Sequence, residues 1–383
     1  MKSEWTLKKL SEIADFNPRE SLRKGTVAKK VGMDKLQPFC RDIPFYELEA
    51  YTGGTKFRNG DTIMARITPC LENGKTAKVN ILEEGEIGFG STEYIVFRAK
   101  EGVDEDFLYY LVCSSIIREP AIKSMVGSSG RQRVQTDVVE NLDIAVPSYE
   151  EQHLIGRILR NLDDKIKINN KINENLEQQA QAYFDKLFVA NADPNWPECT
   201  LSDVGSIVAG GTPSKSKVEY YTDHGIAWIT PKDLSVDKSK FISHGENDIS
   251  ELGLTKSSAT KMPVGTVLFS SRAPIGYIAI AQNEVTTNQG FKSVIPNENI
   301  GTAYVYFLLK NLLPTIEGMA SGSTFKEISG AGMKSVPTVM PDTDTIQLFR
   351  SFCEPLFKEQ EVLEAENKHL SALRDSLLPK LMS

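Results

Sequence analysis

The chain has 383 residues, of which 40% are hydrophobic and 25% charged, and its formal net charge is −7. This length and composition predict a soluble globular protein of two or three domains. No apolar run approaches the length of a membrane span, and the opening "MKSEWTLKKL" lacks the apolar core and cleavage site of a signal peptide. We therefore expect neither a membrane protein nor an exported one, and we place the chain in the cytoplasm.

Residues 1–148 alternate short strand-like runs with turn-rich stretches. The runs "DTIMARI", "TEYIVFRA" and "LDIAVP" are typical of strands, and "DEDFLYYLVCSS" (104–115) is typical of an apolar helix. This mixture predicts a globular α+β domain.

Residues 149–190 have a different composition, with no proline, a single glycine, and many Glu, Lys, Gln and Leu residues. Apolar residues recur there at alternating steps of four and three, which is the spacing of a coiled-coil seam. The predicted seam consists of Leu162, Ile166, Asn169, Asn173, Leu176, Ala180, Tyr183 and Leu187.

Residues 191–341 and 342–383 repeat this order, with a region of short strand-like runs followed by a long helical segment. "TLSDVGSIVAGG" (200–211) parallels "TLKKLSEIADF" (6–16), and "GTVLFSSRAP" (265–274) parallels "GDTIMARITP" (60–69). Pro147 and Pro341 each end a strand-like run before a helical stretch. The second seam consists of Leu356, Gln360, Leu363, Asn367, Leu370, Arg374, Leu377 and Leu381. An internal duplication explains this parallel order, so we expect two pseudo-symmetric halves.

The two long segments should pair antiparallel. A helix of about 40 residues is ~60 Å long. Parallel pairing would require the domain of residues 191–341 to span that distance between its termini, whereas domain termini usually lie close together. Asn173 and Asn367 occupy equivalent seam positions, where buried amides would fix the register at some cost in stability. The alternative is that each helix lies on its own domain without pairing.

The same loop outline also occurs twice, as "VGSSGRQRV" (126–134) and "ASGSTFKEI" (320–328). Arginine, lysine and amide side chains in such loops can contact bases or phosphates. Ser323, Thr324 and Lys326 are the counterparts of the first loop's arginines and glutamine. Our candidate DNA-binding residues are Arg66, Lys75, Thr92, Arg131, Gln132 and Arg133 in the first half, and Lys232, Arg272, Asn288, Gln289, Thr324 and Lys326 in the second.

The sequence offers little that is typical of catalysis. It contains no phosphate-binding loop, no dinucleotide-binding glycine motif and no H-E-x-x-H motif. Its five cysteines and four histidines show no metal-ligand spacing, so we expect reduced thiols and no metal site.

The whole chain resembles the specificity subunits of Type I restriction–modification systems. The stretches that carry the resemblance include "ITPCLENGKTA" (67–77), "WPECTLSDVGSIVAGGTPSK" (196–215) and "WITPKDL" (228–234). The helical stretches 144–172 and 363–382 are similar to that family's two conserved helical regions.

The resemblance implies two target recognition domains (1–148 and 191–341), a central conserved helix (149–190) and a C-terminal one (342–383). Each domain would read one half of a split, asymmetric double-stranded DNA site. The helices would dock two modification subunits, through a surface that includes Leu162, Ile166, Asn173, Leu176, Tyr183, Leu356, Leu363, Asn367, Leu370 and Leu377. Those subunits would bind S-adenosylmethionine, and two restriction subunits that use ATP and Mg²⁺ can join them. No cofactor is expected on this chain.

Two other interpretations remain open at this stage. The net negative charge would suit a scaffold that holds two proteins on a coiled-coil spacer, and its binding would not weaken steeply with salt as DNA binding does. An enzyme with an unfamiliar active site would show turnover from the purified chain alone.

Overall fold

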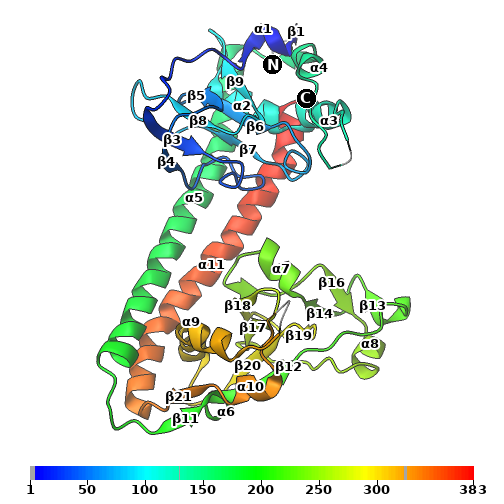
Figure 1. Cartoon of the computed structure of the whole chain (residues 1–383). Helices are drawn as coiled ribbons and strands as arrows, with labels where there is room; N and C mark the ends of the chain where they lie inside the picture. The colour runs from blue at the N-terminus through cyan, green and yellow to red at the C-terminus, as the bar shows by residue number, and fades with distance from the viewer. Residues whose placement is uncertain (1–4, 129, 323–325) are drawn as a thin grey trace. The chain divides into compact units, whose positions relative to one another are not determined.

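The computed structural model describes residues 5–128, 130–322 and 326–383. The chain divides into two compact units, with residues 1–167 and 367–383 in unit 1 and residues 168–366 in unit 2 (Figure 1). Each unit therefore combines one globular domain with a part of each long helix.

Unit 1 contains three antiparallel or mixed sheets and several short helices. Its sheets have the strand orders β1-β10, β2-β9-β6-β7 and β4-β3-β8-β5. The globular elements are β1 (Thr6–Lys9), α1 (Leu10–Ile13), β2 (Ala14–Phe16), β3 (Val27–Val31), β4 (Glu47–Ala50), β5 (Thr55–Phe57), β6 (Thr62–Ala65), β7 (Thr76–Lys78), β8 (Gly88–Gly90), β9 (Tyr94–Ala99), α2 (Glu105–Cys113), α3 (Ser115–Lys123), α4 (Thr136–Glu140) and β10 (Asp143–Val146).

Unit 2 repeats this topology, with strand orders β11-β21, β12-β20-β17-β18-β15 and β13-β16-β14-β19. Its globular elements are β11 (Glu198–Thr200), α6 (Leu201–Val204), β12 (Gly205–Ala209), η2 (Val218–Tyr220), β13 (Tyr221–Thr222), β14 (Ile226–Ile229), α7 (Pro231–Val236), β15 (Phe241–Ile242), β16 (Asn247–Ile249), α8 (Glu251–Thr255), β17 (Val267–Ser271), β18 (Ile275–Ala281), β19 (Val285–Thr287), β20 (Lys292–Pro296), α9 (Thr302–Met319), α10 (Gly330–Lys334) and β21 (Pro337–Val339).

The shared strand orders confirm the internal duplication. The run β2-β9-β6-β7 of unit 1 matches β12-β20-β17-β18 of unit 2 strand for strand, and every neighbouring pair is antiparallel in both. The parallel pair β3 and β8 likewise matches β14 and β19. The predicted α+β class is therefore correct for both halves.

The two long helices are α5 (Tyr149–Asp185) and α11 (Thr343–Leu381). Ser148 and Asp342 are the N-cap residues of these two helices. Their side-chain oxygens accept hydrogen bonds from the backbone amides of Glu151 and Thr345. A short π-helix, η1 (Lys186–Ala190), follows α5, so the regular helix ends five residues before the predicted boundary.

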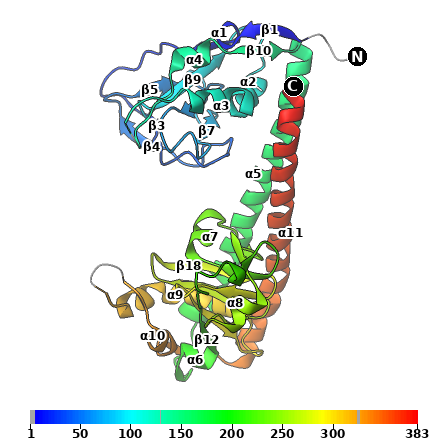
Figure 2. The ribbon, with the colours of Figure 1, turned by 90° about the vertical axis from the view of Figure 1, so that its right-hand side faces the viewer.

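The helices pair antiparallel within each unit, as predicted. In unit 2, Asn169 donates a hydrogen bond to Glu366 at 2.7 Å, and Gln360 donates to the Asn173 carbonyl at 3.1 Å. Further along, the rings of Tyr183 and Phe352 lie 4.4 Å apart. Residue numbers thus rise along α5 as they fall along α11, and the two ribbons run next to each other (Figure 2).

In each unit, the long helices also pack on the globular domain. The alternative in which a helix lies on a domain therefore describes part of the arrangement. In unit 1 the α5 residues Ile155 and Leu159 belong to a core cluster with Phe107 and Met382. In unit 2 the α5 residue Phe184 belongs to a core cluster with Phe307 and Phe349. The helices are therefore part of both hydrophobic cores.

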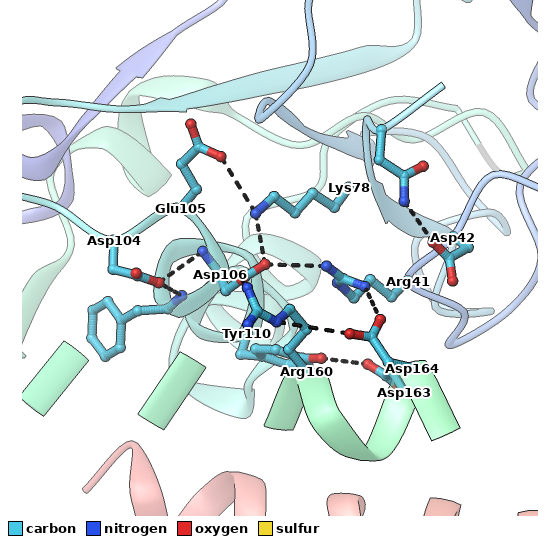
Figure 3. A network of polar contacts seen from close by, with 12 residues as sticks. Arg41, Asp42, Lys78, Asp104, Glu105, Asp106, Tyr110, Arg160, Asp163 and Asp164 are labelled. Carbon is cyan, nitrogen blue, oxygen red and sulfur yellow. Dashed lines mark hydrogen bonds and ion pairs between the residues drawn. The ribbon is translucent and has the colours of Figure 1, made fainter. Parts of the chain in front are cut away.

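Buried ion pairs hold α5 on the domain of unit 1 (Figure 3). Asp106 of α2 accepts hydrogen bonds from Lys78 at 2.6 Å and from Arg160 of α5 at 2.9 Å, and Arg41 lies 3.3 Å away. Burial alone would raise the pKa of Asp106, but these cations outweigh it and lower the pKa below its usual value. The domain thus holds α5 through a charged network that is complete only when α5 is present.

Candidate nucleic-acid interface

The loop of residues 126–134, here called the first loop, lies across the ends of β6 and β9. Ile67 forms a β-bridge with Arg133, and Val134 donates its amide hydrogen to the Arg66 carbonyl at 2.8 Å. The Arg66 amide in turn donates to the Glu93 carbonyl at 2.9 Å. These backbone contacts bring Arg66, Glu93 and Arg133 together from three separate parts of the sequence.

In the second loop (320–328), the described residues 326–328 have the same backbone contacts in unit 2 as their counterparts in the first loop. Arg272 forms a β-bridge with Glu327, and the Ile328 amide donates to the Ser271 carbonyl at 3.1 Å. The Ser271 amide donates to the Gly290 carbonyl at 2.7 Å. The structural counterpart of Arg133 is therefore Glu327, and Lys326 corresponds to Gln132, which shifts our sequence-based pairing of the two loops by one residue.

Each loop contributes one charged residue to an ion cluster. In the first cluster (Arg66, Glu93, Arg133), Nε and Nη2 of Arg133 donate to the Glu93 carboxylate at 2.9 and 2.6 Å, and Nε of Arg66 lies 4.0 Å from it. The hydrogen bond from Arg133 lowers the pKa of Glu93. The carboxylate is therefore ionised at neutral pH and orients the guanidinium of Arg133.

In the second cluster (Arg272, Lys292, Glu327), the carboxylate comes from the loop, while Arg272 directly follows β17 and Lys292 lies in β20. Nη1 of Arg272 lies 3.2 Å from Glu327, and Nζ of Lys292 lies 3.5 Å from it. The two halves thus place charges of opposite sign at the same backbone position. Sequence reasoning missed Glu93, Lys292 and Glu327, although Glu327 stands within the repeated loop outline.

Several other predicted residues border these clusters. Thr92 is exposed on the turn before β9, and Arg131 and Lys326 are exposed with no side-chain hydrogen bond or ion pair to any described residue. Gln289 occupies in unit 2 the place of Thr92 in unit 1, and its side chain accepts a hydrogen bond from Thr212. These four residues remain candidates for DNA contact.

The side chains of three predicted residues are engaged in contacts within the chain. The ammonium of Lys75 donates to the Met33 carbonyl at 2.8 Å, and Asn288 accepts a hydrogen bond from the Gly290 amide at 2.8 Å, so both side chains shape turns. Lys232 pairs with Glu246 at 2.6 Å. Thr324, with its neighbour Ser323, lies outside the described residues.

The seam residues that we predict to dock the modification subunits are partly or fully buried. Among them Leu363 is buried, and the rest are half-buried: Leu162, Ile166, Asn173, Leu176, Tyr183, Leu356, Asn367, Leu370 and Leu377. The seam residues Asn169, Ala180 and Gln360 are buried as well. Other apolar side chains of α5 and α11 point to solvent, among them Ile168, Ile172 and Val362, which are 52%, 39% and 50% exposed. A partner that binds the helices would meet these exposed residues before it meets the seam.

Neither a metal centre nor a membrane-spanning segment is found among the described residues. No group of three His, Cys, Asp or Glu side chains there is placed to hold a metal ion. No helix there combines the length and the apolar character needed to cross a membrane.

Comparison with known proteins identifies the family. The family described as "Type I restriction modification DNA specificity domain" matches residues 2–178 and, a second time, residues 194–370. The chain belongs to this family. The match confirms the resemblance seen in the sequence and the role of a DNA specificity subunit rather than an enzyme.

Individual relatives agree with this assignment. The MjaIX specificity subunit of Methanocaldococcus jannaschii is 35% identical over 190 residues, a match that covers 47% of this chain and 44% of that protein. The match therefore spans less than half of that relative's own length. The HindI specificity subunit of Haemophilus influenzae is 25% identical over 404 positions, which cover 85% of this chain and 86% of that subunit.

A solved structure has the same fold. The crystal structure of a Type I restriction–modification S subunit from M. genitalium is similar with a TM-score of 0.61 and 17% identity, over 100% of this chain and 96% of that one. At this identity the likeness concerns the fold alone.

Proposed function

We propose that this chain reads a split, asymmetric site on double-stranded DNA, with one half-site recognised by each globular domain. The observation that carries the proposal is the repeated loop with different side chains on one backbone arrangement. Arginine recognises guanine and phosphate, whereas amides and carboxylates recognise adenine and cytosine. Two loops that carry different donors and acceptors would therefore read different bases.

The long helices would dock two modification subunits. This part of the proposal rests on the family and on the exposed apolar residues of α5 and α11, since apolar side chains at solvent are typical of protein interfaces. S-adenosylmethionine would then bind to the modification subunits, and ATP and Mg²⁺ to any restriction subunits that join them. Such a complex would work in the cytoplasm, where the chromosome of a prokaryotic cell lies.

Mapping of methylated adenines in the source genome, with and without the gene for this chain, tests the proposal. We expect one two-part sequence with an unspecified gap to lose methylation when the gene is deleted. A continuous motif, or an unchanged methylation map, would contradict the proposal.

The variant Arg131→Ala assigns a half-site to a domain. Because this side chain is exposed and unpaired among the described residues, its loss should alter recognition of one half-site without lowering the melting temperature. If the contact is to phosphate, the slope of log affinity against log salt should fall by about one. Lys75→Met is the matched comparison, since Lys75 supports a turn and its loss should reduce stability instead. A change in both half-sites with Arg131→Ala would contradict the assignment.

A further inference from the structure

The carboxylates of the two ion clusters are the most informative residues that sequence reasoning did not single out. An acidic group at a surface that binds DNA repels phosphate, so its presence needs a reason. Glu93 and Glu327 lie at the two loops, and each contacts at least one arginine that we assign to DNA recognition. Their effect on those cations supplies a reason.

Glu93 restricts the orientation of Arg133. It accepts hydrogen bonds from Nε and Nη2, which fixes the plane of the guanidinium, while Nη1 makes no hydrogen bond to any described residue. A guanidinium held in this way presents its remaining donors in one direction. A free arginine would reach many phosphates and bases instead.

Glu327 plays the corresponding part in unit 2 with its own pair of cations. Lys292 is buried, and Nζ lies 3.3 Å from the Ser271 hydroxyl in addition to its contact with Glu327, so only Arg272 of this pair can reach far into solvent. The oriented cation is thus on the loop in unit 1 and on the end of β17 in unit 2.

We propose that Glu93 and Glu327 are specificity-determining positioning residues, each of which orients one arginine toward the bases of one half-site. The inference rests on the proposed function and deepens it. It predicts that neutralising either carboxylate strengthens non-specific binding, because one repulsive charge is lost, but weakens discrimination between bases, because the arginine is no longer fixed. A purely structural role would weaken both kinds of binding together.

The test uses the full chain assembled with its modification subunits. The probes are a duplex with the mapped two-part sequence and duplexes with one base pair replaced in either half-site. For Glu93→Gln we expect discrimination in one half-site to fall on the order of tenfold, which is the size of one bidentate base contact. Discrimination in the other half-site should be unchanged, and binding to unrelated duplex should increase. Glu327→Gln should lower discrimination in the other half-site and leave discrimination in the first half-site unchanged.

Matched control variants separate the effect of losing a carboxylate beside the arginine from the effect of losing one negative charge anywhere in the domain. Glu86→Gln removes an acidic group that pairs with Lys29 at 3.0 Å at the opposite end of β8, and Glu251→Gln removes one that pairs with Lys261 at 3.2 Å. Both change the net charge by the same amount as the test variants, and neither should change base preference. Arg133→Lys keeps the charge but cannot form the two-pronged contact, so it should relax the same half-site with an unchanged salt dependence.

The outcomes distinguish the inference from the proposed function. If Glu93→Gln leaves base preference intact while Arg131→Ala alters it, the inference is wrong and the reading of a split site stands. The inference is equally wrong if Glu86→Gln has the effect of Glu93→Gln. If the wild-type complex selects no two-part sequence, the proposed function fails and the inference with it. Should Glu93→Gln fail to fold, Glu327→Gln tests the same inference on the other half-site, and unchanged base preference there would overturn it.

Discussion

The side chain of Lys240 is enclosed in unit 2, and its environment has a measurable consequence. Its Nζ donates to Glu177 at 2.7 Å and to Gln360 at 2.9 Å, and it lies 3.4 Å from the centre of the Phe357 ring. Burial lowers the pKa of Lys240 to about 8 from 10.5, although the charge of Glu177 partly opposes this effect. The folded chain therefore releases this proton at a lower pH than the unfolded chain does.

Stability should depend on pH through this lysine. Below pH 8 both states hold the proton and the full cost of burying the ammonium is present. Between about pH 8 and 10.5 the unfolded state binds more protons, so the free energy of unfolding should rise with pH, by up to about 3 kcal/mol in total. Comparing wild type with Lys240→Met by denaturant unfolding at several pH values isolates this contribution. A difference that stays constant from pH 7 to pH 10 would show that the pKa is not lowered.

A buried ion pair between α5 and α11 helps to hold α11 on the domain of unit 1, in addition to the apolar contacts of Leu377, Leu378 and Met382. Arg374 of α11 donates to Asp163 of α5 at 2.7 Å, and Asp163 also accepts a hydrogen bond from the Tyr110 hydroxyl at 2.5 Å. Asp163 is only 8% exposed, so it cannot exchange its partner for bulk water.

Arg374→Met should therefore destabilise unit 1 by about 3 kcal/mol, because it leaves a buried carboxylate without its cation. Hydrogen exchange of the α2 and α5 amides, read as local free energies of opening, would report the loss. Lys358→Met is the control, since Lys358 pairs with Glu361 at the surface and its removal should cost less than about 0.5 kcal/mol. An equal effect of the two substitutions would refute the assigned role of Asp163.

Because the chain consists of two similar halves, one half alone should retain part of its function. A fragment of residues 1–190 keeps one globular domain and one helix, and two copies could pair as the two halves of the full chain do. In such a dimer Ala180 of one copy would take the place of Arg374, since the two occupy equivalent seam positions. Asp163 would then lack its cation.

We therefore expect the fragment to dimerise weakly and Ala180→Arg to tighten the dimer at least tenfold, as measured by sedimentation equilibrium. Assembled with modification subunits, the dimer should methylate a symmetric site made of two copies of one half-site. Methylation of the original asymmetric site by the fragment would contradict the assignment of one half-site to each domain.

The duplication, the α+β class, the two long helices and their antiparallel pairing could all be predicted from the residue pattern. These features follow from local periodicity and from chain geometry: alternating apolar residues specify strands, heptad spacing specifies paired helices, and closely spaced domain termini exclude a parallel pair. The family could also be inferred from sequence, because its motifs are continuous stretches such as "WITPKDL".

Which charged residues act together depends on the folded chain and could not be predicted from the residue pattern. Glu93 is 40 residues from Arg133, and Glu327 is 55 residues from Arg272, so no local pattern connects them. Nor could the sequence tell that the ammonium of Lys75 is used by a backbone carbonyl while Arg131 is left unpaired among the described residues. Whether a charge is available to a ligand depends on the groups that the fold brings within about 4 Å of it, and that distance is set by strand pairing between remote segments.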